Sequence, residues 1–233
     1  MDYAARFGEF YSTALLADAA FHTGVPLGVA PPGLAPLAQR DKLAGPVVTV
    51  EANNDLLTIM AAVHRARPGE VILVSNKTYE VGLIGDLLGL DAKRKGLAGF
   101  IVDGSVRDAV ELIELGMVVV CRGLLPIGPL KLAPELKGIG QIGVEVRLGD
   151  AAVKPGDWAF ADADGVIFLP LEGLPAAFER AAILLEREKA LAAEMRAGAS
   201  LGDIFGLEAF LEKRAEDPAA DFNAHLAALG RAI

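Results

Sequence analysis

The first half of the chain alternates short apolar runs with segments whose apolar residues recur every three to four positions. Residues 45–51 (GPVVTVE) are rich in β-branched side chains and predict a strand. Residues 56–66 follow the polar stretch 53–55 (NND) and predict a capped helix, and the run 71–74 (VILV) predicts a second strand. A strand, a helix and a strand in this order are typical of an α/β fold.

The same alternation continues beyond this unit. Residues 87–95 have helical periodicity and end at a glycine, and the continuous apolar run 97–102 is typical of a strand buried on both faces. Residues 103–108 (DGSVRD) are then expected to form a turn. Residues 110–115 predict another short helix, which leads into the strand 117–121. The fold class that follows is α/β.

The pattern changes after residue 123. Short β segments are expected there, 143–148 in particular, and residues 157–162 and 166–170 flank an Asp-Gly pair that is a strong hairpin signal. Residues 174–196 carry an unbroken helical pattern, and two shorter helical segments follow. We interpret residues 174–233 as a helical tail that packs on the domain or on a neighbouring subunit.

Composition and charge narrow the class of protein. The chain has 233 residues, 53% of them hydrophobic, which predicts a well-filled core, and no apolar run is long enough to cross a membrane. With 31 acidic and 22 basic residues the net charge is −9, which disfavours a nucleic-acid or anionic-membrane partner. Cys121 is the single cysteine, so no internal disulfide is expected. We expect a cytoplasmic protein that acts on a small substrate or binds a protein.

Two acidic turns rich in glycine carry the candidate chemistry. Residues 85–88 (GDLL) open a predicted helix, whose first N–H groups have no partner inside the helix and therefore attract anions. Gly82 and Gly85 would let a ligand approach the backbone. Arg107 and Asp108 follow the predicted strand 97–102, and ligands collect at the carboxyl ends of strands in open α/β sheets. These turns are the predicted binding site.

The residues of these turns resemble those of a known family. Residues 103–111 (DGSVRDAVE), with residues 85–88 upstream and PGDW (155–158) and DADGV (162–166) downstream, resemble the RraA-like family of 4-hydroxy-4-methyl-2-oxoglutarate aldolases and ribonuclease E regulators. The resemblance extends from residue 12 to about residue 198. It implies a compact layered β/β/α domain of the swivelling type over residues 1–173, assembled as a homotrimer or a dimer of trimers with sites between subunits.

The resemblance also implies roles for individual residues. It implies a lyase, for which we expect Mg²⁺ or Mn²⁺, that cleaves 4-hydroxy-2-keto diacids to pyruvate and a keto acid, with oxaloacetate decarboxylation as a side activity. A glutamate of the 174–196 helix is implied to reach a neighbouring subunit's site. The site residues carried over by the resemblance are Gly85, Leu87, Leu88 and Arg107 for the substrate, Asp108 for the metal, Asp86 for a water, and Glu188, with Glu186 as the alternative.

The chemistry of such a reaction agrees in kind with these residues. Cleavage beside a 2-keto group leaves an enolate of pyruvate, and a divalent cation with Arg107 beside it would stabilise that charge. Mg²⁺ keeps several waters, so one carboxylate at Asp108 can suffice. A Schiff-base route is disfavoured because Lys93 and Lys95 lie on a helix among charged neighbours.

Structural roles compete with each functional one. Asp108 and Asp86 could be plain helix caps, since Asp is a leading N-cap residue. Asp162 and Asp164 could form a metal pair, but turn residues are the simpler interpretation, and Cys121 fits a core position better than a nucleophile.

Two other function classes stay open alongside the lyase. One is a protein-binding regulator of ribonuclease activity; that branch of the family lacks the acid after the arginine, so Asp108 favours the enzyme. The other is an enzyme that depends on a nucleotide or on S-adenosylmethionine. No Gly-x-Gly-x-x-Gly follows a predicted strand, which argues against this class.

Overall fold

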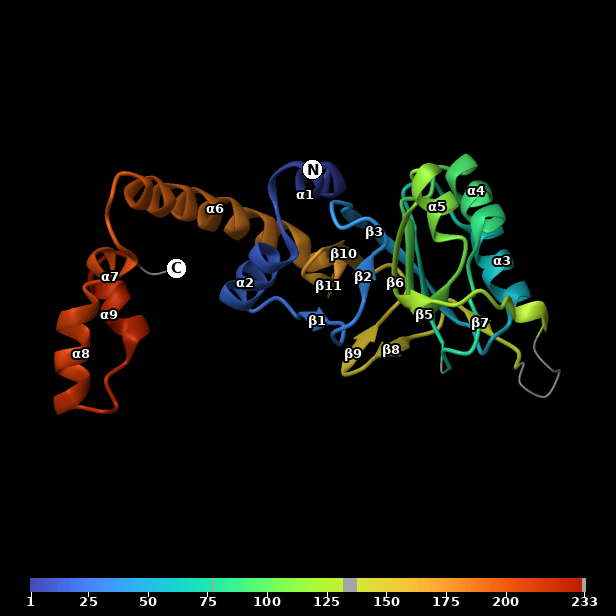
Figure 1. Cartoon of the computed structure of the whole chain (residues 1–233). Coiled ribbons are helices and arrows are strands. Elements are labelled where there is room, and N and C mark those ends of the chain that lie inside the picture. Colours follow the sequence, from blue (N-terminus) through green and yellow to red (C-terminus); the bar gives the residue numbers. More distant parts are fainter. Residues whose placement is uncertain (77, 132–137, 232–233) are drawn as a thin grey trace. The chain divides into compact units, whose positions relative to one another are not determined.

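The computed structural model describes residues 1–76, 78–131 and 138–231, and the chain divides into two compact units, Met1–Phe178 and Glu179–Ile233 (Figure 1). The first unit is a mixed α/β structure built on a large sheet. The second unit is helical. The long helix α6 (Leu174–Arg196) begins in the first unit and continues into the second.

Four parallel strands form the centre of the large sheet. They are adjacent in chain order, with Val47 of β3 beside Val71 of β4, and Gly99 of β5 beside Val118 of β6. Antiparallel strands extend the sheet on both sides. The bounds are β1 Gly28–Val29, β2 Ala35–Pro36, β3 Leu43–Glu51, β4 Val71–Ser75, β5 Gly99–Val106, β6 Val118–Leu124, β7 Gln141–Ile142, β10 Trp158–Asp162 and β11 Gly165–Leu169, in the order β1-β11-β10-β3-β4-β5-β6-β2 with β7 paired to β3.

The sheet lies between a helical layer and a small second sheet. Helices α3 (Leu56–Arg65), α4 (Asp86–Arg94) and α5 (Ala109–Glu114) cover one face (Figure 1), over a core that includes Ile59 and Phe100. The hairpin of β8 (Val146–Leu148) and β9 (Ala151–Val153) packs its buried side chains on the other face, against β3, β4 and β5. This β/β/α layering confirms the predicted fold class.

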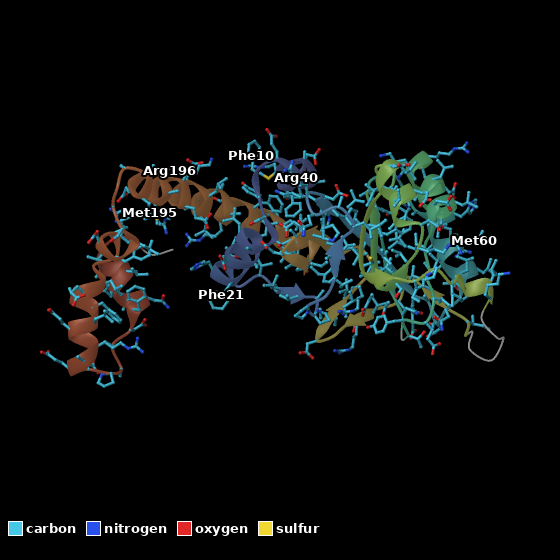
Figure 2. The ribbon with its side chains drawn as sticks, viewed as in Figure 1. Phe10, Phe21, Arg40, Met60, Met195 and Arg196 are labelled. Carbon is cyan, nitrogen blue, oxygen red and sulfur yellow. The ribbon has the colours of Figure 1, made fainter. Side chains whose placement is uncertain are left out.

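The buried side chains between the helices and the sheet form one hydrophobic cluster, and Figure 2 draws the side chains on the ribbon. Helix α3 is amphipathic: Ile59 and Val63 are fully buried, whereas Met60, labelled in Figure 2, is half exposed. Asp55 caps this helix by accepting a hydrogen bond from the N–H of Leu57 at 3.0 Å. The predicted helix therefore forms with the expected cap.

Strand β5 is longer than its apolar run predicts. Residues 103–106, expected to form a turn, continue the strand, and all of them are buried. Between Val102 and Ser105 the register with β6 shifts, because three steps along β5 match two steps, from Cys121 to Gly123, along β6. This is a β-bulge, which bends a strand and changes the direction of the residues that follow. The turn prediction for residues 103–106 was wrong.

The N-terminal helices α1 (Tyr3–Phe10) and α2 (Thr13–Thr23) belong to the first unit. Asp162, at the end of β10, is buried and accepts hydrogen bonds from the N–H and the hydroxyl of Thr13 at 2.8 and 2.6 Å. It also accepts the N–H of Asp164 at 3.1 Å. Asp162 therefore links the β10–β11 hairpin to α2. These contacts agree with a structural role for Asp162 as a turn residue rather than with a metal pair.

The second unit has an aromatic core of its own. The Phe210 ring centroid lies 4.8 Å from that of Phe222 and 5.1 Å from that of His225. Nε2 of His225 forms a hydrogen bond with the carbonyl oxygen of Phe205 at 2.8 Å. Three short helices follow α6 where two were expected: α7 Leu201–Ile204, α8 Leu207–Glu216 and α9 Phe222–Ala228. None of the helices in the described part of the chain is long and apolar enough to span a membrane.

Candidate functional site

Three segments meet where the parallel strands end. Residues 82–84 run beside the end of β5, with the Leu83 N–H donating to the Ser105 carbonyl and the Arg107 N–H donating to the Ile84 carbonyl, both at 2.9 Å. The segment after β6 crosses to the same place, and the Gly82 N–H donates to the carbonyl of Ile127 at 2.8 Å. Backbone hydrogen bonds therefore fix the three segments together.

Gly85 is the residue on which the two acidic turns come into contact. It is the N-cap of α4 and offers no side-chain cap, so the helix begins at Asp86 rather than being capped by it. A Cβ built on Gly85 would collide with the carboxylate of Asp108 and lie 3.2 Å from Nε of Arg107. A larger residue here would displace the Asp108 side chain, so glycine is what lets the carboxylate approach the start of α4.

The backbone of Asp108 is in the left-handed region, with φ 55° and ψ 45°, an unusual conformation that Asp tolerates better than most residues. Asp108 stands at the N-cap position of α5 yet its side chain makes no capping hydrogen bond. Its Oδ2 instead accepts hydrogen bonds from Nε of Arg107 at 2.9 Å and from the Asp86 N–H at 3.4 Å. The plain capping role does not account for this residue.

The electrostatics of the pair follow from that geometry. The hydrogen bond from Arg107, reinforced by the Asp86 N–H, lowers the pKa of Asp108 below its usual value, although partial burial opposes the change. In turn Asp108 raises the pKa of Arg107. Asp108 is therefore a carboxylate, and Arg107 a cation, throughout the neutral range.

The pair lies in a cleft of about 280 Å³. The cleft has mostly apolar walls, and the side chains of Arg107 and Asp108 remain 41% and 28% exposed to solvent within it. Its lining residues are Leu56, Gly82, Leu83, Gly85, Asp86, Leu87, Leu88, Arg107, Asp108, Gly128, Pro129, Leu130 and Lys131.

The start of α4 offers free backbone donors to this cleft. The N–H of Gly89 is bonded to the carbonyl of Gly85 at 3.0 Å, so the N–H groups of Leu87 and Leu88 precede the first hydrogen bond within the helix. Such groups at the positive end of the helix dipole can hold a carboxylate or a keto oxygen.

The predicted site residues separate into two groups. The residues of the two turns, from Gly85 to Leu88 together with Arg107 and Asp108, all line the cleft. Glu188 does not line it: Glu188 lies exposed on α6 in the second unit, and Glu186 pairs with Lys189 at 2.8 Å.

The sequence reasoning missed the segment Gly128–Lys131, which forms another wall of the cleft. A Gly-Pro pair after a strand signals a turn, but nothing in its spacing relates that turn to Arg107. The contact is tight: a Cβ on Gly128 would lie 2.8 Å from Nη1 of Arg107.

The donor set fits a hard divalent cation held by few protein ligands. No group of three or more His, Cys, Asp or Glu side chains that could share a metal ion occurs in the described part of the chain. Both hydrogen bonds to Asp108 from described residues end on Oδ2, which leaves Oδ1 as the atom for a cation. Mg²⁺ and Mn²⁺ accept one carboxylate together with waters and substrate oxygens. Asp108 is thus a possible single protein ligand.

Other candidate groups have structural partners. Lys93 donates to the carbonyl of Gly116 at 2.8 Å and Lys95 to that of His64 at 2.7 Å, and neither lysine lines the cleft. Cys121 is buried, and burial raises the pKa of its thiol, which disfavours the nucleophilic thiolate.

Comparison with known proteins matches residues 13–168 to the family model described as RraA-like, Aldolase/RraA. The chain belongs to the RraA-like aldolase family. A relative from Halalkalibacterium halodurans, named "Putative 4-hydroxy-4-methyl-2-oxoglutarate aldolase", is 32% identical over 182 residues, which cover 77% of this chain and 82% of the relative. The matched region of the family model contains every residue that lines the cleft.

Solved structures share the fold of this RraA-like chain. One is titled as an S-adenosylmethionine:2-dimethylmenaquinone methyltransferase from Geobacillus kaustophilus HTA426, with 29% identity and a TM-score of 0.61 over 68% of this chain and 94% of that one. Another is titled as the RNA-processing inhibitor RraA from Thermus thermophilis, with 27% identity and a TM-score of 0.58 over 66% of this chain and 92% of that one.

Proposed function

We propose that this protein is a divalent-metal-dependent lyase that cleaves 4-hydroxy-2-keto diacids, of the 4-hydroxy-4-methyl-2-oxoglutarate type, to pyruvate and a keto acid. The observation that carries the proposal is the contact of Arg107 and Asp108 with the glycine start of α4 inside one cleft. Oxaloacetate decarboxylation is the proposed side activity, because both reactions pass through an enolate of pyruvate.

The roles follow from the atoms that each residue presents. The N–H groups of Leu87 and Leu88 hold the substrate carboxylate, and the guanidinium of Arg107 donates to the keto oxygen as negative charge develops on it. Mg²⁺ or Mn²⁺ at Asp108 would supply further positive charge there. Asp86, at the first turn of α4, orients the water that returns a proton to the enolate carbon.

Retro-aldol cleavage also needs a base for the 4-hydroxyl. In this proposal Glu188 of a neighbouring subunit serves that end of the substrate, which requires a homotrimer or a dimer of trimers. Light scattering on a size-exclusion column tests the assembly, and an active monomer would exclude a site completed by a second subunit.

The test of the reaction is pyruvate release from a panel of 2-keto diacids, measured on chelated protein before and after Mg²⁺ or Mn²⁺ is restored. We expect no activity in the chelated protein and recovery with either ion. Asp108→Asn should stay inactive with both ions while its thermal unfolding stays close to that of the wild type. Full activity after chelation would refute the metal requirement.

A second candidate function is regulation of a ribonuclease, favoured by the similarity to the RNA-processing inhibitor. Asp108 beside Arg107 argues for the enzyme, because its carboxylate supplies the metal ligand that the proposed lyase needs. A metal-loaded protein that released no pyruvate yet bound a ribonuclease tightly would favour the regulator.

A methyltransferase function has less support. Residues 138–143 (GIGQIG) match the spacing Gly-x-Gly-x-x-Gly, but they contain the strand β7 (Gln141–Ile142) and no helix follows them directly. The phosphate-binding form of this motif needs a helix N-terminus directly after it.

A further inference from the structure

Lys131 is the second cationic side chain that lines the cleft, besides Arg107. It ends the short 3-10 helix η1 (Pro129–Lys131), and its N–H donates to the carbonyl of Gly128 at 3.1 Å. Its ammonium group makes no hydrogen bond or ion pair with any other residue that the structure describes. A lysine on a cleft wall that has no partner among the described residues is available to a ligand.

The position of Lys131 relative to Arg107 is fixed by the backbone. Gly128 lies against the guanidinium, since a Cβ there would be 2.8 Å from Nη1. A 3-10 helix rises about 2 Å per residue, so the backbone of Lys131 stands roughly 6 Å along the wall from that contact. The segment is held in turn by the hydrogen bond from the Gly82 N–H to the carbonyl of Ile127 at 2.8 Å. The backbone that carries Lys131 is therefore held close to the Arg107 guanidinium along one wall.

The rest of the lining favours a second cation for one class of ligand. Five leucines line the cleft: Leu56, Leu83, Leu87, Leu88 and Leu130. A carboxylate placed against apolar side chains loses its hydration, and the loss is costly unless a cation or donor replaces the water. Arg107 and the start of α4 can serve one end of a keto acid. A carboxylate at the other end would face leucines unless Lys131 meets it.

We propose that Lys131 binds the second carboxylate of the substrate and so selects keto diacids over keto monoacids. This inference rests on the proposed lyase function, with the pyruvoyl end of the substrate at Arg107 and Asp108. The charge-assisted hydrogen bond from the ammonium group contributes to binding and not to the enolate chemistry. Loss of Lys131 should therefore raise KM for diacids and leave kcat much less changed.

The experiment compares Lys131→Met and Lys131→Arg with the wild type, metal-loaded, on one diacid and one monoacid that undergo the same cleavage: 4-hydroxy-2-oxoglutarate and 4-hydroxy-2-oxopentanoate. Lys131→Met should raise KM for the diacid at least about tenfold and change kcat/KM for the monoacid less than about threefold. Lys131→Arg, which keeps the charge, should recover most of the diacid affinity. Lys154→Met removes one charge from the exposed residue that follows β9 and is the matched control.

A binding measurement makes the test independent of turnover. Calorimetric titration with 2-oxoglutarate, a diacid without a 4-hydroxyl, should show a Kd at least about tenfold higher in Lys131→Met, whereas the Kd for pyruvate should stay unchanged. Equal losses for diacid and monoacid, or no loss for either, would overturn the role of Lys131. A wild-type protein that binds no keto acid and releases no pyruvate would instead refute the lyase function on which the inference rests.

Discussion

Arg122 on β6 forms an ion pair with Asp103 on β5 directly across the β-bulge, and the side chains are only 20% and 11% exposed. Arg122 lies between Cys121 and Gly123, the two residues of β6 that match the longer stretch of β5. Its Nη1 also donates to the carbonyl of Pro32 at 2.7 Å. The pair therefore holds the distorted part of β5 at Asp103, four residues before Arg107 of the cleft.

Arg122→Met should lower the free energy of unfolding by about 3–5 kcal/mol, because it leaves the carboxylate of Asp103 largely buried and without its cation. Chemical denaturation measures this change. The double variant Arg122→Met/Asp103→Leu removes the uncompensated charge and should regain part of the loss. If the double variant were less stable than Arg122→Met alone, the coupling assumed here would be absent.

Gly85→Ala should reduce activity by about two orders of magnitude, because a methyl group at this position collides with Asp108 and displaces it from Arg107. We also expect a loss of about 1–3 kcal/mol in stability from the overpacking. Gly123→Ala is the matched control, since a Cβ there meets nothing within 4 Å. Steady-state kinetics on both variants decide the matter, and equal activities would show that the contact is unimportant.

The elements of this fold could be read from the sequence because their signals are local. Asp55 caps α3 as expected, and the apolar runs of β4 and β5 indicate buried strands. The bulge at Asp103 could not be foreseen, since it depends on the register with β6 and on its partner Arg122.

The candidate site was only partly predictable for the same reason. Arg107 and Asp108 stood out because a charged pair followed a buried strand. The close approach of Gly85 to Asp108 joins residues 23 positions apart in the chain, and the hydrogen bond from Asp86 to Asp108 joins residues 22 positions apart. Lys131 was missed because its relation to Arg107 exists only once Gly128 packs on the guanidinium.

The pH dependence of metal binding should reflect the lowered pKa of Asp108. Because the folded-state pKa lies below the value of about 3.9 for a free Asp, protons do not compete for this carboxylate between pH 7.5 and 5.5. The stabilisation from the Asp108 interactions is present above about pH 4 and is lost as the pH falls through the lowered pKa. We expect Mn²⁺ affinity, measured by calorimetry, to change less than about twofold over that range. A tenfold loss by pH 5.5 would mean that another group with a higher pKa holds the ion, and Asp108→Asn should then still bind it.

Glu188 and Asp108 should give separable effects on the two reactions. Retro-aldol cleavage must remove a proton from the 4-hydroxyl, whereas decarboxylation expels neutral CO₂ and needs no base at that end. Glu188→Gln keeps the shape of the side chain and removes the base, so it should lower kcat for aldol cleavage by about 10²–10⁴-fold and leave oxaloacetate decarboxylation within a few-fold of wild type.

Glu186→Gln is the control on the same helix, because Glu186 forms an ion pair with Lys189 at 2.8 Å and its substitution is expected to change neither activity. Asp108→Asn should lower both activities together, since both pass through the enolate. Equal activity of Glu188→Gln and wild type in aldol cleavage would remove Glu188 from the mechanism. Water or Asp86 would then be the base for the 4-hydroxyl.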